Sequence, residues 1–174
     1  MRISTGIKAS IVSSLLALTG FAAAPADDKA FIDEAGASGI AEVKLSELAV
    51  TQSGDPEVKD FARKMIDEHS LTNDKLLAVC SGKVALPPRE MSTAAKKRFA
   101  ELSKIKGSKF DRAYLATMLD DHKKAVKLFE KEAAKGFDPD IRQFAGNTLP
   151  TLKHHLEMVL TLDRELRGRQ ASRD

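Results

Sequence analysis

Apolar side chains recur three or four residues apart along four long stretches of the chain, which is the spacing of one buried face of an α-helix. Two of these stretches open with Asp followed by Pro, at Asp55 and Asp138, where Asp suits the N-cap and Pro suits the first helical turn. Gly136 ends the third stretch, as glycine commonly ends a helix. The pattern therefore predicts helices over about residues 28–50, 55–80, 108–136 and 138–166.

No stretch shows the strict alternation that is typical of a strand, so the sequence predicts an all-α protein built as a four-helix bundle. Short turns at 51–54 and 136–137 fold the helices into two antiparallel hairpins. Residues 81–107 form a longer connection that carries a short helix over about 92–102. A crossover of this length between helix 2 and helix 3 can make those two helices parallel, as in ferritin-like folds. The alternative is an up-and-down bundle with this segment as a flap over one end.

The start of the third helix is predicted at Ser108, because Asp111 three residues later completes a pattern close to a capping box. Asp111 also falls on the apolar face of that helix. It lies about three turns before His122, roughly 16 Å away at 1.5 Å per residue. We therefore expect Asp111 to cap the helix and not to share a site with His122.

The N-terminus carries the pattern of a secretory signal peptide over residues 1–26. Arg2 and Lys8 precede an apolar run over 11–23, and Ala24-Pro25-Ala26 supplies the small residues of a cleavage site before Asp27. The interpretation is a protein exported to the periplasm or elsewhere in the cell envelope; the alternative is an uncleaved N-terminal anchor. The predicted domains are the signal peptide at 1–26, the bundle at 27–167 and a flexible basic tail at 168–174.

Charge argues against nucleic acid as a partner. Removal of residues 1–26 takes away two basic residues and no acidic one, which reduces the formal net charge from +3 to +1. A nearly neutral chain lacks the basic surface that nucleic acids and anionic membranes attract. After signal cleavage we expect no integral membrane span, and no motif identifies a protein partner. The single cysteine, Cys80, ends an apolar helical face and is expected to be buried.

The candidate chemistry lies in four polar residues that interrupt the apolar faces. Glu42, His69, His122 and His155 each fall near the middle of a different predicted helix. In a four-helix bundle such positions meet in one layer, and imidazole with carboxylate suits a transition-metal ion such as Zn, Cu, Fe or Ni. The sequence therefore predicts one metal ion bound by Glu42, His69, His122 and His155. The methionines near these histidines are more typical of core packing than of metal ligation.

Di-iron oxidase chemistry is not expected from this pattern. Such sites use one Glu on each of two helices and a Glu-x-x-His motif on each of the other two. Here Ile66 precedes His69 by three residues, Leu152 precedes His155 by three, and His122 occupies a position where a Glu is needed. We therefore expect a non-catalytic protein.

A metal-free interpretation explains the same residues. Three imidazoles and Glu42 can satisfy one another as a hydrogen-bond network, as buried polar groups must. The protein would then be a structural or stress-related envelope protein. Glu68 and Asp121 directly precede His69 and His122, so they point about 100° away and are expected outside the layer. His154 is expected outside it for the same reason.

Four segments resemble one bacterial family. They are GIAEVKLSELA at Gly39–Ala49, VKDFARKMIDEHS at Val58–Ser70, FDRAYLATMLDDHKKAVKLFE at Phe110–Glu130 and FAGNTLPTLKHHLE at Phe144–Glu157. Together, in this order, they are similar to exported proteins grouped as the domain of unknown function 4142 family. The resemblance covers nearly all of the mature chain. It implies a ferritin-like bundle and an envelope location, and it implies no activity.

Overall fold

The structure is a computed structural model that describes residues 26–83 and 85–171. These residues contain five helices and no strand: α1 (Ala26–Gln52), α2 (Pro56–Cys80), α3 (Thr93–Leu102), α4 (Gly107–Lys135) and α5 (Pro139–Ala171). The prediction of an all-α protein is confirmed for this part of the chain. None of the described helices is long and apolar enough to cross a membrane.

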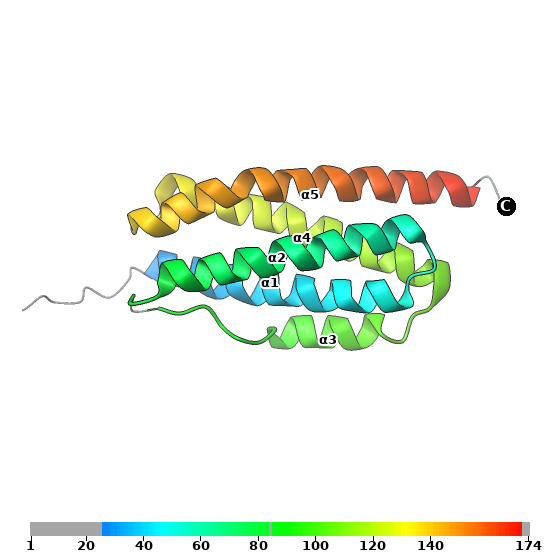
Figure 1. The fold of residues 1–174 in the computed structure, drawn as a ribbon, viewed down its shortest axis with the longest axis horizontal. Helices are drawn as coiled ribbons and strands as arrows, with labels where there is room; N and C mark the ends of the chain where they lie inside the picture. The colour runs from blue at the N-terminus through cyan, green and yellow to red at the C-terminus, as the bar shows by residue number, and fades with distance from the viewer. Residues whose placement is uncertain (1–25, 84, 172–174) are drawn as a thin grey trace, which may run out of the picture.

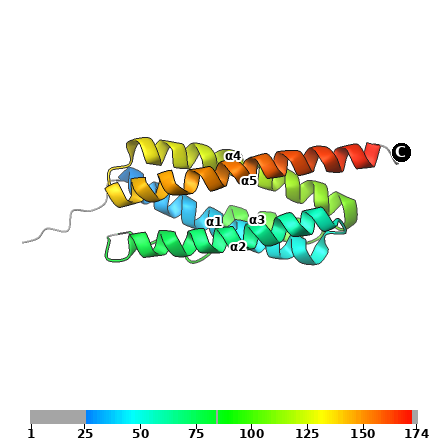
Figure 2. The ribbon, with the colours of Figure 1, turned by 45° about the horizontal axis from the view of Figure 1, so that its top comes forward.

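The four long helices lie side by side, and α3 lies along their flank (Figure 1). Helices α1 and α2 form one antiparallel hairpin, and α4 and α5 form the other. The connection between α2 and α4 returns along the length of the helices, so these two helices run in the same direction (Figures 1 and 2). Contacts are most extensive within each hairpin, and the hairpins meet through α1 with α4 and α2 with α5.

Two predicted helix starts are capped as expected. The Asp55 side chain accepts hydrogen bonds from the backbone N–H groups of Glu57 and Val58 at the start of α2. Asp138 caps α5 in the same way. The carboxylate of Asp28, at the start of α1, accepts bonds of 2.8 and 2.7 Å from the backbone N–H groups of residues 137 and 138. The beginning of α1 thus holds the turn between α4 and α5.

The predicted capping box at the start of α4 is wrong. The helix begins at Gly107, whose φ of 60° is a conformation that glycine adopts readily, and no side chain caps it. Asp111 is buried, and hydrogen bonds from Ser53 and Gly54 act on its carboxyl group. Burial nevertheless raises the pKa of Asp111. This side chain therefore ties α4 to the turn between α1 and α2.

The core consists of two apolar clusters with a polar layer between them. One cluster includes Leu45, Tyr114 and Val159, together with Met65 and Met118. The other includes residues nearer the start of α1 and the end of α2, at positions 31, 76, 129 and 152. The two methionines thus belong to the apolar core, as expected. Cys80 is also buried, as predicted, and burial raises the pKa of its thiol to about 11.

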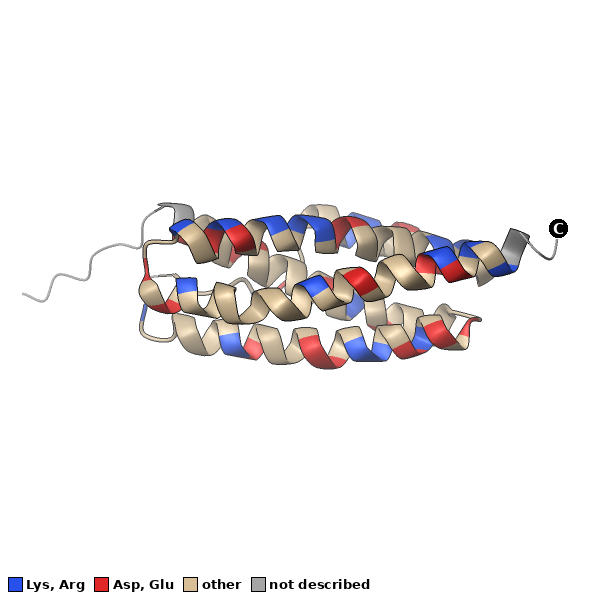
Figure 3. Cartoon of the chain, turned by 90° about the horizontal axis from the view of Figure 1, so that it is seen from above, with Lys and Arg blue, Asp and Glu red and all other residues tan. Residues whose placement is uncertain are grey.

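The short helix α3 covers the seam between α1 and α4, since it contacts both. The Arg98 guanidinium donates to both carboxylate oxygens of Asp121 at 2.7 Å, which pins α3 to α4. The amide of Gln52 donates to the carbonyl of Ser103 at the end of α3. Lys, Arg, Asp and Glu are interspersed along the outer faces of the long helices (Figure 3).

The ends of the chain bear on the predicted domain limits. The predicted signal peptide lies outside the described residues except for Ala26, where α1 begins. Helix α5 continues past residue 167 to Ala171, so the first residues of the expected flexible tail are helical. The Arg169 side chain in this segment bonds to Asp55 and Glu57 at the start of α2. The bundle limits and the signal peptide stay predictions.

Candidate metal centre

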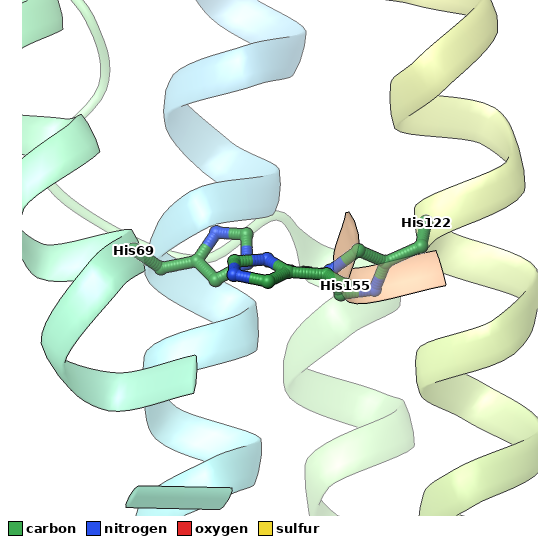
Figure 4. A group of neighbouring side chains, drawn as sticks. All are labelled: His69, His122 and His155. Atoms are coloured by element: carbon green, nitrogen blue, oxygen red, sulfur yellow. Dashed lines mark hydrogen bonds between the residues drawn. The ribbon is translucent and has the colours of Figure 1, made fainter. Parts of the chain in front are cut away.

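The polar layer brings together all four residues singled out in the sequence. Glu42 comes from α1, His69 from α2, His122 from α4 and His155 from α5. All four are buried, and the most accessible of them, His69, is only 3% exposed. The centroids of the three imidazole rings lie 5.1–5.4 Å apart, and the rings extend from their helices toward one another at one level (Figure 4).

Each imidazole ring is held from outside by a hydrogen bond through one nitrogen. His69 Nδ1 donates to Glu42 Oε2 at 2.8 Å. His122 Nδ1 donates to the backbone carbonyl of Met118 at 2.9 Å. His155 Nε2 donates to Glu68 Oε2 at 2.6 Å. Because a neutral imidazole carries only one N–H, these bonds leave a lone pair on the other nitrogen of each neutral ring.

The remaining nitrogens have few partners of their own. His69 Nε2 and His122 Nε2 lie 3.4 Å apart. His155 Nδ1 is buried and has no hydrogen-bond partner among the described residues. One nitrogen from each ring lies within 4.8 Å of those of the other two rings. The 3.4 Å between His69 Nε2 and His122 Nε2 suits a hydrogen bond when one of the two nitrogens carries a proton.

The electrostatics identify where a proton resides in the metal-free layer. Burial acts to raise the pKa of Glu42, but the charge and hydrogen bond of His69 and the charges of the other two histidines lower it to about 2. Burial acts to lower the pKa of His69, but Glu42 outweighs that effect and raises it above 6.5. Both shifts favour the charged forms, an anionic Glu42 and a cationic His69. In that form the Nε2–H of His69 donates to His122 Nε2, 3.4 Å away.

His155 behaves differently from His69. Burial and the nearby charge of His69 lower its pKa to about 4, although Glu68 opposes the change. The ring is therefore neutral near pH 7, and its buried Nδ1 keeps a free lone pair. Glu42 Oε1 is a second buried atom without a hydrogen bond among the described residues, 3.7 Å from His122 Nδ1. Buried polar atoms without partners are uncommon and call for a physical explanation.

Glu68 flanks the layer, as expected, but its bond to one of the imidazoles was not predicted. Its side chain is 31% exposed, yet one carboxylate oxygen bonds to His155 across the seam between α2 and α5, and the other bonds to Lys64. Asp121, in the equivalent place before His122, bonds to Arg98 instead. His154 is exposed, as expected. Residue spacing predicts only the direction in which the Glu68 side chain leaves α2. It does not predict the position of the carboxylate at the end of that side chain, which points elsewhere.

The geometry defines a helical protein with a buried layer of three imidazoles and their carboxylate partners. The family model for "Domain of unknown function (DUF4142)" matches residues 16–162, so the chain belongs to that family, as the resemblance indicated. No curated protein matches the sequence significantly.

Solved structures share the fold at low sequence identity. The DUF305 fragment from Deinococcus radiodurans is 14% identical, with a TM-score of 0.71, over 83% of this chain and 99% of that one. CopM in its Cu(II)-bound form is 15% identical, with a TM-score of 0.66. CopM in its Cu(I)-bound form is 16% identical, with a TM-score of 0.63. Both CopM matches cover 79% of this chain and 96% of CopM.

Proposed function

We propose that this protein is an exported, non-catalytic helical protein that binds one transition-metal ion in its buried histidine layer. One observation carries the proposal: each of the three rings is held through one nitrogen by an outer acceptor. Metal-binding histidines are commonly oriented in this way, by a carboxylate or a backbone carbonyl on the nitrogen that faces away from the metal. Both kinds of acceptor occur here.

The ligands are His69 Nε2, His122 Nε2 and His155 Nδ1. Two nitrogens bonded to one metal at 2.0–2.1 Å with a tetrahedral angle lie about 3.4 Å apart. The observed separation of 3.4 Å between His69 Nε2 and His122 Nε2 matches this value. His155 has to move inward by on the order of 1 Å to complete a site with such bonds. Its Nδ1, buried and without a partner, gains a partner by doing so.

Glu42 takes a different role from the one that the sequence suggested. Its Oε2 accepts the hydrogen bond from His69 Nδ1, so Glu42 orients that ring and compensates the charge of the metal. Its second oxygen, Oε1, lies 3.7 Å from His122 Nδ1, which is also a nitrogen that faces away from the metal, so Glu42 acts from outside the set of ligands. The proposed site therefore consists of His69, His122 and His155 as ligands, with Glu42 as their buried carboxylate.

Copper is the first candidate among the metals that imidazole suits, which also include zinc, iron and nickel. A given nitrogen site generally binds Cu²⁺ most strongly among divalent first-row metals. CopM, whose fold is similar, has been solved with both Cu(II) and Cu(I). Almost complete burial of the rings favours holding an ion over turning over a substrate.

Fold and location complete the proposal. The parallel arrangement of α2 and α4, with a connection along the bundle, supports a ferritin-like four-helix bundle with a long crossover. The N-terminal pattern supports cleavage of residues 1–26 and a periplasmic or other envelope location. The mass of the protein purified from the envelope tests cleavage; a chain that begins at Met1 contradicts it.

Metal content measured on tag-free protein tests the metal site. We expect about one copper per chain after dialysis against Cu²⁺, and its loss in His69→Ala and His122→Ala. His154→Ala is the matched control, since it removes an exposed imidazole from the residue next to His155. Wild-type protein that retains no more copper, zinc or nickel than the His69→Ala and His122→Ala variants refutes the proposal.

The second candidate function is a structural envelope protein whose layer works without metal. One observation favours it: a proton on His69 links Glu42, His69, His122 and the Met118 carbonyl in one continuous chain of hydrogen bonds. The two candidates differ in their response to chelators. A melting temperature that is unchanged by added copper and by chelators supports the structural role, whereas a large rise with copper supports the metal site.

A further inference from the structure

We propose that the metal enters and leaves the histidine layer through the seam between α2 and α5, and that Glu68 carries it across. This inference rests on the proposed metal site. It assigns to Glu68 the role of a residue that binds the ion in transit. Among the four seams between neighbouring long helices in the described part of the chain, the seam between α2 and α5 places a carboxylate, that of Glu68, between solvent and an imidazole.

The other three seams are covered more completely, although a small cavity of about 30 Å³ among the long helices is lined by Glu42 and His69. The seams inside the two hairpins, α1 with α2 and α4 with α5, have the most extensive helix contacts. The seam between α1 and α4 is covered by α3. There the acid that precedes His122, Asp121, is held by both oxygens on Arg98, and its side chain is only 13% exposed.

The seam between α2 and α5 is open on both sides of Glu68. A groove of about 750 Å³ runs from Thr72 and Thr151 toward the end of α2. A second groove, of about 610 Å³, runs the other way and is lined by Lys64, His154 and Met158 among others. Lys64 and Thr72 each lie one helical turn from Glu68, so the two grooves approach this residue from opposite directions.

Glu68 joins the second groove to the buried layer. Its Oε1 bonds to Lys64, which lines that groove, and its Oε2 bonds to His155 Nε2 at 2.6 Å. The His155 side chain is only 1% exposed, against 31% for Glu68. Four carboxylates line the same groove: Glu57, Asp60, Glu157 and Glu165. Glu57 is paired with Arg169 and Asp60 with Arg63, so with the Lys64 ammonium included the groove keeps a small net negative charge. A groove of this charge raises the local concentration of cations.

The passage needs no covalent step. A cation from the groove replaces the Lys64 ammonium on Glu68 Oε1, so one positive partner is exchanged for another. The His155 ring then turns to offer its unpartnered Nδ1, and the cation moves to that nitrogen and on to His69 and His122, while the Nε2 proton of His69 is released to solvent. Glu68 returns to Lys64 and to His155 once the ion has passed.

The rates of copper binding and release test this route. Stopped-flow mixing with Cu²⁺ gives the association rate, and mixing of loaded protein with excess chelator gives the release rate. Glu68→Gln keeps an oxygen acceptor for His155 but removes the charge, so we expect both the association rate and the release rate to fall about tenfold. Lys64→Met keeps the aliphatic stem and removes the competing ammonium, so we expect both rates to rise.

The matched controls are Glu47→Gln and Lys44→Met, which remove the same charges from an exposed ion pair on α1. Both should leave the rates at the wild-type values. Unchanged rates in Glu68→Gln and Lys64→Met overturn the route. A change in release alone, with a matching loss of affinity, also overturns it, because Glu68 then only positions His155. Wild-type protein that binds no copper overturns the metal site itself, which is a different result.

Discussion

Replacement of His155 by Gln should flatten the pH dependence of stability in the metal-free protein. Burial and the charge of His69 lower the pKa of His155 from 6.5 to about 4. Between pH 6.5 and about pH 4, His155 is therefore protonated in the unfolded chain but neutral in the folded protein. The folded state loses stability across this window as the pH falls. At about 1.4 kcal/mol per pH unit, the full loss is about 3 kcal/mol.

Urea unfolding in the presence of chelator measures this loss. Between pH 7 and pH 4.5, most of the window is crossed, so the His155 contribution to the free energy of unfolding should fall by about 2 kcal/mol in the wild type. The His155→Gln variant should lack that part of the decrease. His154→Gln makes the same chemical change at an exposed neighbouring residue and should behave as the wild type.

The neighbouring groups change stability elsewhere on the pH scale or in the opposite direction. The raised pKa of His69 contributes stability that is complete below pH 6.5 and is lost as the pH rises through the folded pKa. The lowered pKa of Glu42 contributes stability that is lost only as the pH falls from 4.5 toward 2. Equal pH profiles for wild type and His155→Gln between pH 7 and 4.5 would therefore refute the description of His155 as a buried neutral ring.

Three further changes test other parts of the structure. His122→Ala removes a fully buried ring and leaves the Met118 carbonyl without its donor, so the metal-free protein should lose about 2–4 kcal/mol in urea unfolding. Asp28→Ala removes the acceptor for two backbone N–H groups before α5 and should cost about 1 kcal/mol, with faster hydrogen exchange at Phe137; unchanged exchange there contradicts the cap. Arg98→Ala frees α3 from Asp121, and limited proteolysis should cut residues 81–106 faster than in the wild type.

The sequence predicted the helices well because their signals are local. The 3.6-residue period and the Asp-Pro starts depend only on neighbours along the chain, and α2 and α5 begin where these signals lie. The four central polar residues could also be predicted from the sequence. A polar residue on an apolar helical face must find partners in the same layer, and the positions of Glu42, His69, His122 and His155 show which layer that is.

The misses concern long side chains that act across the bundle. Glu68 lies about 100° from His69 on α2, but its three flexible torsions bring its carboxylate to a histidine on α5. Asp111 matched a local capping pattern, yet its contacts are with the turn between α1 and α2. The spacing of residues predicts the direction in which a side chain leaves its helix, whereas the position of its end depends on neighbours that only the tertiary structure supplies.

The crossover gives the histidine layer a consequence for the chain as a whole. His69 belongs to the first hairpin, whereas His122 and His155 belong to the second, and the two hairpins are joined covalently only through residues 81–106. An ion bonded to all three rings is therefore a cross-link between two halves of one polypeptide. In this respect the protein resembles a heterodimer whose subunits are tethered. A single cut in the tether should leave two fragments that hold together more firmly with the ion than without it.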